Sequence, residues 1–208
     1  MPTQAAFWDK TARKYAARPV SNVPNYEDTL TRARAYLHPQ DKALEIGCGT
    51  GTTALKLAGN VGHLVGTDIS PEMIAIGREK LADGGPGNVT FEVADVMDLP
   101  STDDGYDAVL AFNVLHLIED LPGAVSAIRD RLKPGGVMIS KSVGVGEANW
   151  FLRNLMLPAL TLLGKAPFVH VMRAKDFDGI IAGAGFEVLE THTYQGMAPT
   201  RLIIARKV

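Results

Sequence analysis

The sequence predicts an α/β fold: a doubly wound, seven-stranded, mostly parallel sheet with an antiparallel last strand and helices on both faces. Strand-like apolar runs alternate with helical patterns, and such alternation implies βαβ units and a parallel sheet. The last two runs are joined by a short glycine-containing turn, which predicts an antiparallel hairpin. The predicted strands cover residues 42–46, 63–68, 89–93, 106–111, 136–142, 187–194 and 200–206.

Helical patterns fill the intervals between these strands. Pro71 follows Ser70, and a serine cap with proline in the first turn is typical of a helix start. Two further helical segments precede the first strand, and Pro19 ends the first of them. The predicted helices cover residues 5–18, 26–37, 50–58, 71–81, 122–132 and 174–184.

Length and composition bound the class of protein. A chain of 208 residues fits one α/β domain. The net charge of −2 gives no basic field that would attract nucleic acid. Cys48 is the single cysteine, which fits a reducing, cytoplasmic location. No signal peptide or bilayer-spanning run is predicted, and no metal-ligand spacing is present, so no metal is expected.

A glycine-rich turn follows the first predicted strand. Gly47, Gly49 and Gly51 occupy alternate positions after Glu45. Glycine adopts positive φ and carries no Cβ, so a ligand can lie directly against main-chain N–H groups. This pattern alone fits a structural turn as well as a nucleotide-like site.

Acids at the ends of later strands favour the ligand site. Asp68 ends the second predicted strand about 20 residues after the first glycine, the spacing of a ribose-binding carboxylate. Asp95 follows the third predicted strand, and Asn113 follows the fourth. Parallel strands place their carboxyl ends at one edge of a sheet, where such folds bind ligands.

These motifs resemble class I S-adenosylmethionine-dependent methyltransferases of the small-molecule type, which have a Rossmann-like fold. Thr52 stands where a dinucleotide-binding fingerprint would need its third glycine. The motifs that carry the resemblance are Leu44–Gly51, Gly66–Met73, Ala94–Pro100, Tyr106–His116 and Arg131–Gly136.

The resemblance implies S-adenosylmethionine as the cofactor and assigns residues to it. Asp68 is expected to accept from the ribose hydroxyls and Asp95 from the adenine amino group, while Glu45 orients the glycine turn. Ile69 and Met97 would enclose the adenine ring. The full predicted cofactor set is Tyr15, Glu45, Gly47, Cys48, Gly49, Asp68, Ile69, Met73, Asp95, Val96, Met97 and Asn113.

The same resemblance divides the single domain, residues 1–208, into parts. Residues 1–40 would form a helical cover, 42–142 the cofactor-binding core, and 174–208 the last helix and hairpin. Residues 145–173 are strongly apolar and interrupted by Pro158. They would form a lid insertion, or alternatively a core or dimer-forming helix; a membrane-surface contact is a minor third interpretation, since the segment lacks a basic polar face.

Methyl transfer to a small, partly apolar acceptor is the predicted function. His116 is the candidate catalytic base, since a histidine of near-neutral pKa can remove a proton; it can equally be a packing residue. Trp150, His170 and His116 are the candidate substrate contacts. The alternatives are a nicotinamide-dependent oxidoreductase and a non-catalytic cofactor-binding partner subunit.

Overall fold

Seven strands form one sheet in the order β3-β2-β1-β4-β5-β7-β6. The computed structural model describes residues 3–208. The five strands from β3 to β5 pair in parallel, whereas β7 runs antiparallel to both of its neighbours, so the predicted sheet is confirmed. The strands are β1 (Lys42–Ile46), β2 (His63–Asp68), β3 (Val89–Val93), β4 (Tyr106–Phe112), β5 (Leu132–Val143), β6 (Phe186–Tyr194) and β7 (Thr200–Lys207).

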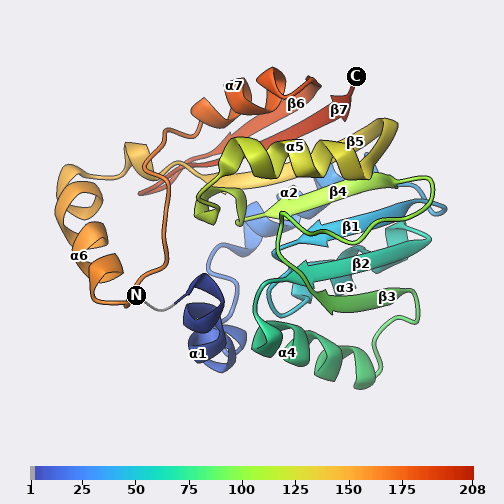
Figure 1. Cartoon of the computed structure of the whole chain (residues 1–208), viewed down its shortest axis with the longest axis horizontal. Coiled ribbons are helices and arrows are strands. Elements are labelled where there is room, and N and C mark those ends of the chain that lie inside the picture. The colour runs from blue at the N-terminus through green and yellow to red at the C-terminus, as the bar shows by residue number, and fades with distance from the viewer. Residues whose placement is uncertain (1–2) are drawn as a thin grey trace.

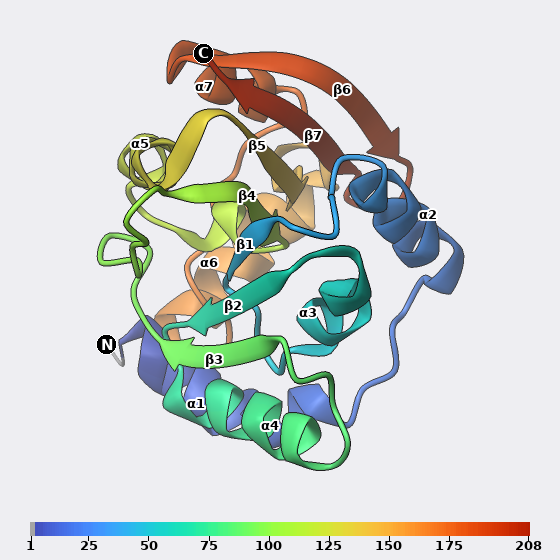
Figure 2. The same ribbon diagram turned by 90° about the vertical axis from the view of Figure 1, so that its right-hand side faces the viewer.

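Helices cover both faces of this sheet (Figures 1 and 2). Helices α2 and α3 pack on one face, and α5 and α7 pack on the other. Helix α1 packs on α4 beside the β3 edge. The helices are α1 (Gln4–Ala16), α2 (Val23–Arg34), α3 (Thr52–Leu57), α4 (Pro71–Ala82), α5 (Leu121–Arg131), α6 (Leu157–Leu162) and α7 (Asp176–Gly183), with shorter turns η1 (Ala58–Asn60), η2 (Leu115–Leu117), η3 (Val145–Glu147) and η4 (Leu152–Met156).

The central strands bury side chains on both faces. Ala43 of β1 packs toward α2 and α3, while Leu44 packs toward α5 and α7. A strand covered on both sides reads as a continuous apolar run without polar alternation. This burial explains why the sequence marks β1 and β2 at the residues where they occur, whereas the edge strand β3 buries only alternate residues.

Helix α2 begins earlier than predicted. It covers Val23–Arg34, whereas the sequence pattern predicted residues 26–37. The Asn22 side chain accepts a hydrogen bond from the Asn25 N–H, and a proline lies in the first turn. A side-chain cap followed by proline fixes the helix start at Asn22, whereas the sequence pattern predicted a start after Asn25.

Phe91 of β3 fills the space that three glycine residues leave open. A Cβ at Gly51 would lie 2.4 Å from the Phe91 ring, and one at Gly66 would lie 2.8 Å from it. Gly77 of α4 faces the same ring at 3.4 Å. The third glycine of the turn therefore serves packing, because its missing side chain admits Phe91.

The apolar segment between β5 and α7 projects beyond the sheet (Figure 1). It forms the π-helical turn η4, which passes into α6 with Pro158 in the first turn of α6. The helix type thus changes next to the proline, as the predicted interruption at Pro158 requires. Within residues 3–208, no helix is both long and apolar enough to cross a bilayer.

Candidate cofactor site

A cleft of about 340 Å³ opens at the carboxyl ends of the parallel strands, and α1 lies across it. This volume is within the range of small-molecule sites. Ten residues of the predicted cofactor set line the cleft, which brings together segments far apart in sequence. They are Tyr15, Gly47, Gly49, Asp68, Ile69, Met73, Asp95, Val96, Met97 and Asn113.

The glycine turn and Asp68 hold each other in place. The Gly49 N–H donates to Asp68 Oδ2 at 2.9 Å, and the Ser70 N–H donates to Asp68 Oδ1 at 2.9 Å. Each carboxylate oxygen has two lone pairs, so each can accept one further hydrogen bond from a ligand. Burial raises the pKa of Asp68, and these two N–H donors oppose the rise.

The turn is open where a ligand would approach it. Gly49 has a φ of +55°, and a Cβ built there would meet only Tyr15 Cε1, at 3.8 Å. A Cβ at Gly47 would instead lie 2.4 Å from Val114. Gly47 therefore allows close packing on the segment after β4, and Gly49 keeps the floor of the cleft free.

Asp95 lies at the rim of the cleft and is exposed. The Met97 N–H donates to Asp95 Oδ1 at 2.9 Å, which orients the carboxylate. Met97 is 54% exposed. The apolar side chains of Ile69 and Val96 line the cleft with it, so an acid and apolar groups meet here. This combination suits a flat ring that carries an amino group.

Glu45 lies beneath the turn, outside the cleft lining. It is buried, and its Oε2 has no hydrogen-bond partner. Burial, with a smaller effect of Asp68, raises the pKa of Glu45 to about 8. Cys48 is buried too, and burial raises the pKa of its thiol. Tyr15 lines the cleft on α1, and its pKa is raised by burial and then by Asp68 and Glu45.

Asn113 has a strained backbone at the cleft. Its φ of +57° makes it the only non-glycine residue with positive φ among those described. Its N–H donates to the Lys141 carbonyl at 2.7 Å. Asparagine tolerates the left-handed region better than most residues, and such strain gathers at ligand sites. This conformation turns the chain after β4 along the cleft wall.

The predicted substrate residues lie away from the cleft lining. His116 in η2 is 7% exposed, its Nδ1 has no partner, and burial lowers its pKa to about 4. His170 is its neighbour: the His170 N–H donates to the His116 carbonyl at 2.8 Å. The ring Nε2 of His170 lies 2.7 Å from the Ile118 carbonyl. Trp150 is 67% exposed. Their predicted roles stay predictions.

Several cleft residues were not predicted from the sequence. Gln4 of α1 donates through Nε2 to the Leu117 carbonyl at 3.0 Å, while its buried Oε1 has no partner. Trp8 of α1 lines the same part of the cleft. Both become site residues only because α1 folds onto the segment after β4, and no local motif indicates that contact. The remaining lining residues of that segment are Val114, Leu117, Ile118, Glu119 and Asp120.

Comparison with known proteins supports a family assignment. Residues 43–136, which contain the glycine turn and both strand-end acids, match the family described as a methyltransferase domain. This match supports a class I S-adenosylmethionine-dependent methyltransferase. S-adenosylmethionine is the cofactor that this family assignment implies.

Relatives of this methyltransferase domain include a demethylmenaquinone methyltransferase of Clavibacter sepedonicus. It is 38% identical over 121 residues, which are 58% of this chain and 48% of that protein. The chain spans about half the length of the curated relatives it matches.

Solved structures share the fold of the methyltransferase domain at low identity. The N-methyltransferase NodS from Bradyrhizobium japonicum WM9, in complex with S-adenosyl-L-homocysteine, superposes with a TM-score of 0.70 and 19% identity, covering 96% of this chain and 98% of that one. The [4+2]-cyclase SpnF superposes with a TM-score of 0.72 and 21% identity, covering 88% and 80%. One of these neighbours is named for a cyclisation, so the fold by itself does not fix the reaction.

Proposed function

We propose that this protein transfers the methyl group of S-adenosylmethionine to a small, partly apolar acceptor of the hydroxylated quinone type. One observation carries the proposal: a single cleft combines a polar part around Asp68 and Asp95 with an apolar part around Trp8 and Leu117. The name of the Clavibacter relative supports a quinone-type acceptor. The cytoplasmic location and the homodimer stay predictions.

The polar part of the cleft fits the cofactor. Asp68 would accept from both ribose hydroxyls, since each of its oxygens keeps a free lone pair. Asp95 would accept from the adenine amino group, with Val96 and Met97 beside the ring. The open backbone at Gly49 would admit the methionine part. The cofactor supplies an already activated methyl group, so these residues mainly bind and orient.

The apolar part would receive the acceptor. Trp8 and Leu117 offer apolar walls, and Gln4 Oε1 is a buried acceptor without a partner. A hydroxyl of the methyl acceptor could donate to this oxygen, which would favour a hydroxylated ring over a fully apolar one. Glu119 and Asp120 also line the cleft and can receive a proton.

Calorimetric titration with S-adenosylhomocysteine, with NADH as the control, tests the cofactor. Micromolar binding of the homocysteine product without NADH binding is expected. Turnover of S-adenosylmethionine is then measured with hydroxylated quinols and with matched rings that lack the hydroxyl. Binding of NADH without binding of S-adenosylhomocysteine would instead support the nicotinamide-dependent oxidoreductase.

The second candidate function is that of a non-catalytic cofactor-binding partner subunit. The buried position of His116 is the observation that makes this function worth testing. With a pKa of about 4, His116 is neutral but a weak base at pH 7. If it is nevertheless the general base, His116→Ala lowers turnover by about 100-fold. Product binding with no transfer to any acceptor tested would support the non-catalytic partner.

A further inference from the structure

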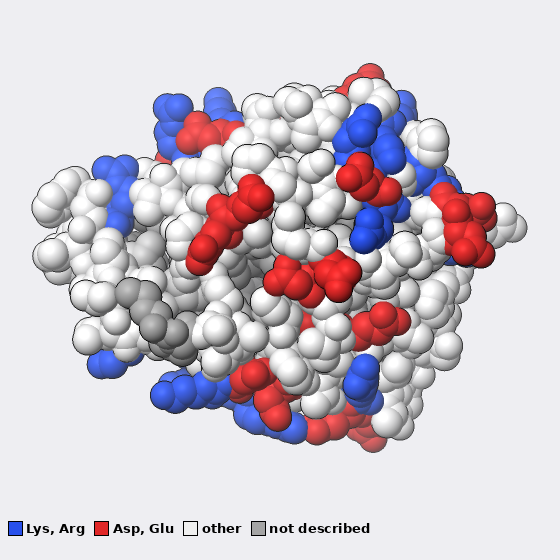
Figure 3. Space-filling model, viewed as in Figure 1, with Lys and Arg blue, Asp and Glu red and all other residues white. Residues whose placement is uncertain are grey.

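Residues 148–175, here called the lid segment, have a charge opposite to that of the rest of the protein. The segment overlaps the predicted lid insertion, residues 145–173, and lies between Glu147 and Asp176. It contains no Asp or Glu itself and carries Arg153, Lys165, Arg173 and Lys175. Its formal charge is therefore +4, and because the whole chain carries −2, the other residues carry −6. In Figure 3 the lobe at the left is white with isolated blue groups, whereas the remaining face carries both red and blue groups, with red groups at its centre.

The lid segment also exposes large apolar side chains. Seven of the 14 exposed large hydrophobic residues in the described chain lie in it, so they form a concentrated surface. Leu162 is 70% exposed, a value typical of a polar surface residue. The seven are Trp150, Phe151, Leu155, Met156, Leu162, Leu163 and Val171.

These side chains follow the solvent-facing side of the helix. Phe151, Leu155 and Leu162 are spaced by four and seven residues, which places them on one face. All three are more than half exposed, while Leu157 and Leu160 are partly buried on the inner side. An ordinary surface helix has polar residues on its outer face, so this arrangement indicates an apolar partner.

We propose that the lid segment docks on the surface of a bilayer that contains anionic lipids. The outward apolar stripe is the face that a helix lying in the membrane interface would bury, and the cations Lys165, Arg173 and Lys175 follow this helix in the chain. Tryptophan favours that interface, and Trp150 begins the exposed stripe. The excess negative charge elsewhere would turn the remainder of the molecule away from the lipid, which orients the lid segment toward it.

The charge argues against a second copy of the chain as the occupant. A self-interface through the lid segment would bring two surfaces of the same positive sign together, and like charges at an interface are unfavourable. Arg153 donates to the Gly146 carbonyl at 2.6 Å, and Arg173 pairs with Asp176 at 3.1 Å. Lys165 is exposed and lies nearest to α6 in the chain, so it is the cation to test.

Co-sedimentation of the full chain with vesicles tests the proposal, and it does not depend on methyl transfer. Vesicles of phosphatidylcholine with phosphatidylglycerol should bind the protein, and vesicles of phosphatidylcholine alone should bind it less. The double variant Leu155→Ser/Leu162→Ser should reduce partitioning by at least about tenfold. Lys165→Glu reverses one charge and should reduce it by about fivefold or more, with a loss of binding as salt is added.

Matched variants outside the lid segment control for exposure and charge. Met197→Ser removes a 92% exposed apolar side chain of the β6–β7 loop, and Lys42→Glu reverses an exposed cation of β1. Both should bind anionic vesicles as the parent does. Thermal unfolding verifies that every variant is folded. Absence of vesicle binding, or equal losses in the control variants, overturns the proposal. So does a dimer in sedimentation velocity that Leu155→Ser/Leu162→Ser dissociates while vesicle binding is unchanged.

Discussion

Glu45 and Lys141 are both ionisable residues buried against the central sheet, but their surroundings differ. Lys141 Nζ donates to Thr29 Oγ1 at 2.8 Å and lies 4.4 Å from the centre of the Tyr194 ring. Glu45 Oε2 has no partner. Burial lowers the pKa of Lys141, and Asp28 opposes that effect. Burial and then Asp68 raise the pKa of Glu45, and only a backbone hydrogen bond from Ala54 opposes the rise.

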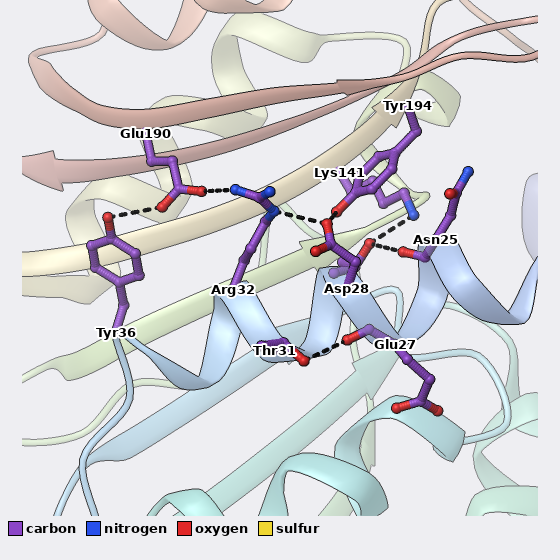
Figure 4. Close-up of polar contacts among 10 residues, drawn as sticks. Asn25, Glu27, Asp28, Thr31, Arg32, Tyr36, Lys141, Glu190 and Tyr194 are labelled. Carbon is purple, nitrogen blue, oxygen red and sulfur yellow. Dashed lines mark hydrogen bonds and ion pairs between the residues drawn. The ribbon is translucent and has the colours of Figure 1, made fainter.

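A chain of polar contacts extends from Lys141 across α2 and β6 (Figure 4). The Tyr194 hydroxyl donates to Asp28 Oδ2 at 2.7 Å, and Arg32 pairs with both Asp28 and Glu190. This network joins α2, β5 and β6 by side-chain hydrogen bonds and ion pairs. The difference teaches that the buried polar groups of this packing network satisfy one another, whereas Glu45, beneath the glycine turn, keeps one oxygen without a partner.

Asp68→Ala should have the largest effect and act on binding. Loss of two charge-assisted hydrogen bonds to the ribose should weaken S-adenosylhomocysteine binding by about 100-fold or more. Calorimetric titration measures this affinity. Asp83→Ala, a change in the loop after α4, should leave it unaltered. Near-parental affinity in Asp68→Ala would remove Asp68 from the cofactor site.

Glu45→Gln should change how stability depends on pH. Because folding raises the pKa of Glu45 from 4.5 to about 8, the folded state holds a proton that the unfolded chain releases between these values. The free energy of unfolding contributed by Glu45 is therefore present below pH 4.5 and falls as pH rises toward 8. Between pH 5 and pH 8, the free energy of unfolding of Glu45→Gln should therefore fall by about 2–4 kcal/mol less than that of the parent protein.

Urea unfolding of the ligand-free protein at pH 5 and pH 8 measures that change. Glu92→Gln, an exposed residue of β3, is the control. If the parent and Glu45→Gln show the same slope against pH, Glu45 titrates normally in the folded state.

Lys141→Ala should act on stability alone. It removes a buried stem and the hydrogen bond to Thr29, so the free energy of unfolding should fall by about 2 kcal/mol. Affinity for S-adenosylhomocysteine should remain within about twofold, because the network lies on the α2 side of the sheet. Denaturation and calorimetry on the same sample separate the two quantities. A large loss of affinity would show that the network and the cleft are coupled.

Asn113 should give the smallest effect on stability. Asn113→Ala puts alanine at a φ of +57°, where its Cβ is strained and no side-chain amide compensates, so the free energy of unfolding should fall by about 1 kcal/mol. Asn113→Gly should lower it by less, because glycine adopts positive φ without strain. If the Asn113 side chain contacts the cofactor, both variants lose affinity equally. Thermal unfolding and calorimetry of the pair separate backbone strain from side-chain contact.

The sequence predicted the sheet, and ten residues of the predicted cofactor set line one cleft, because both depend on local signals. Strand β2 ends in Asp68, and the acid and the glycine turn are each readable from neighbouring residues. Gln4 and Trp8 were missed as cleft residues because their position depends on how α1 packs on α4. His116 follows β4 as predicted and its side chain is buried; whether it serves as a base or as a packing residue stays a prediction, because sequence spacing does not fix the direction of a 3₁₀ turn.

Phe91 makes four positions of the chain interdependent. Gly51, Gly66 and Gly77 come from different elements. Whether a larger residue can replace each of these glycines depends on the size of the side chain at residue 91. Gly66→Ala alone should be damaging, and Phe91→Leu should relieve part of that damage while leaving a cavity of its own, with a coupling of about 1–2 kcal/mol in a double-mutant cycle. In evolutionary terms these sites are epistatic, so a variant library that samples them one at a time would reject combinations that fold.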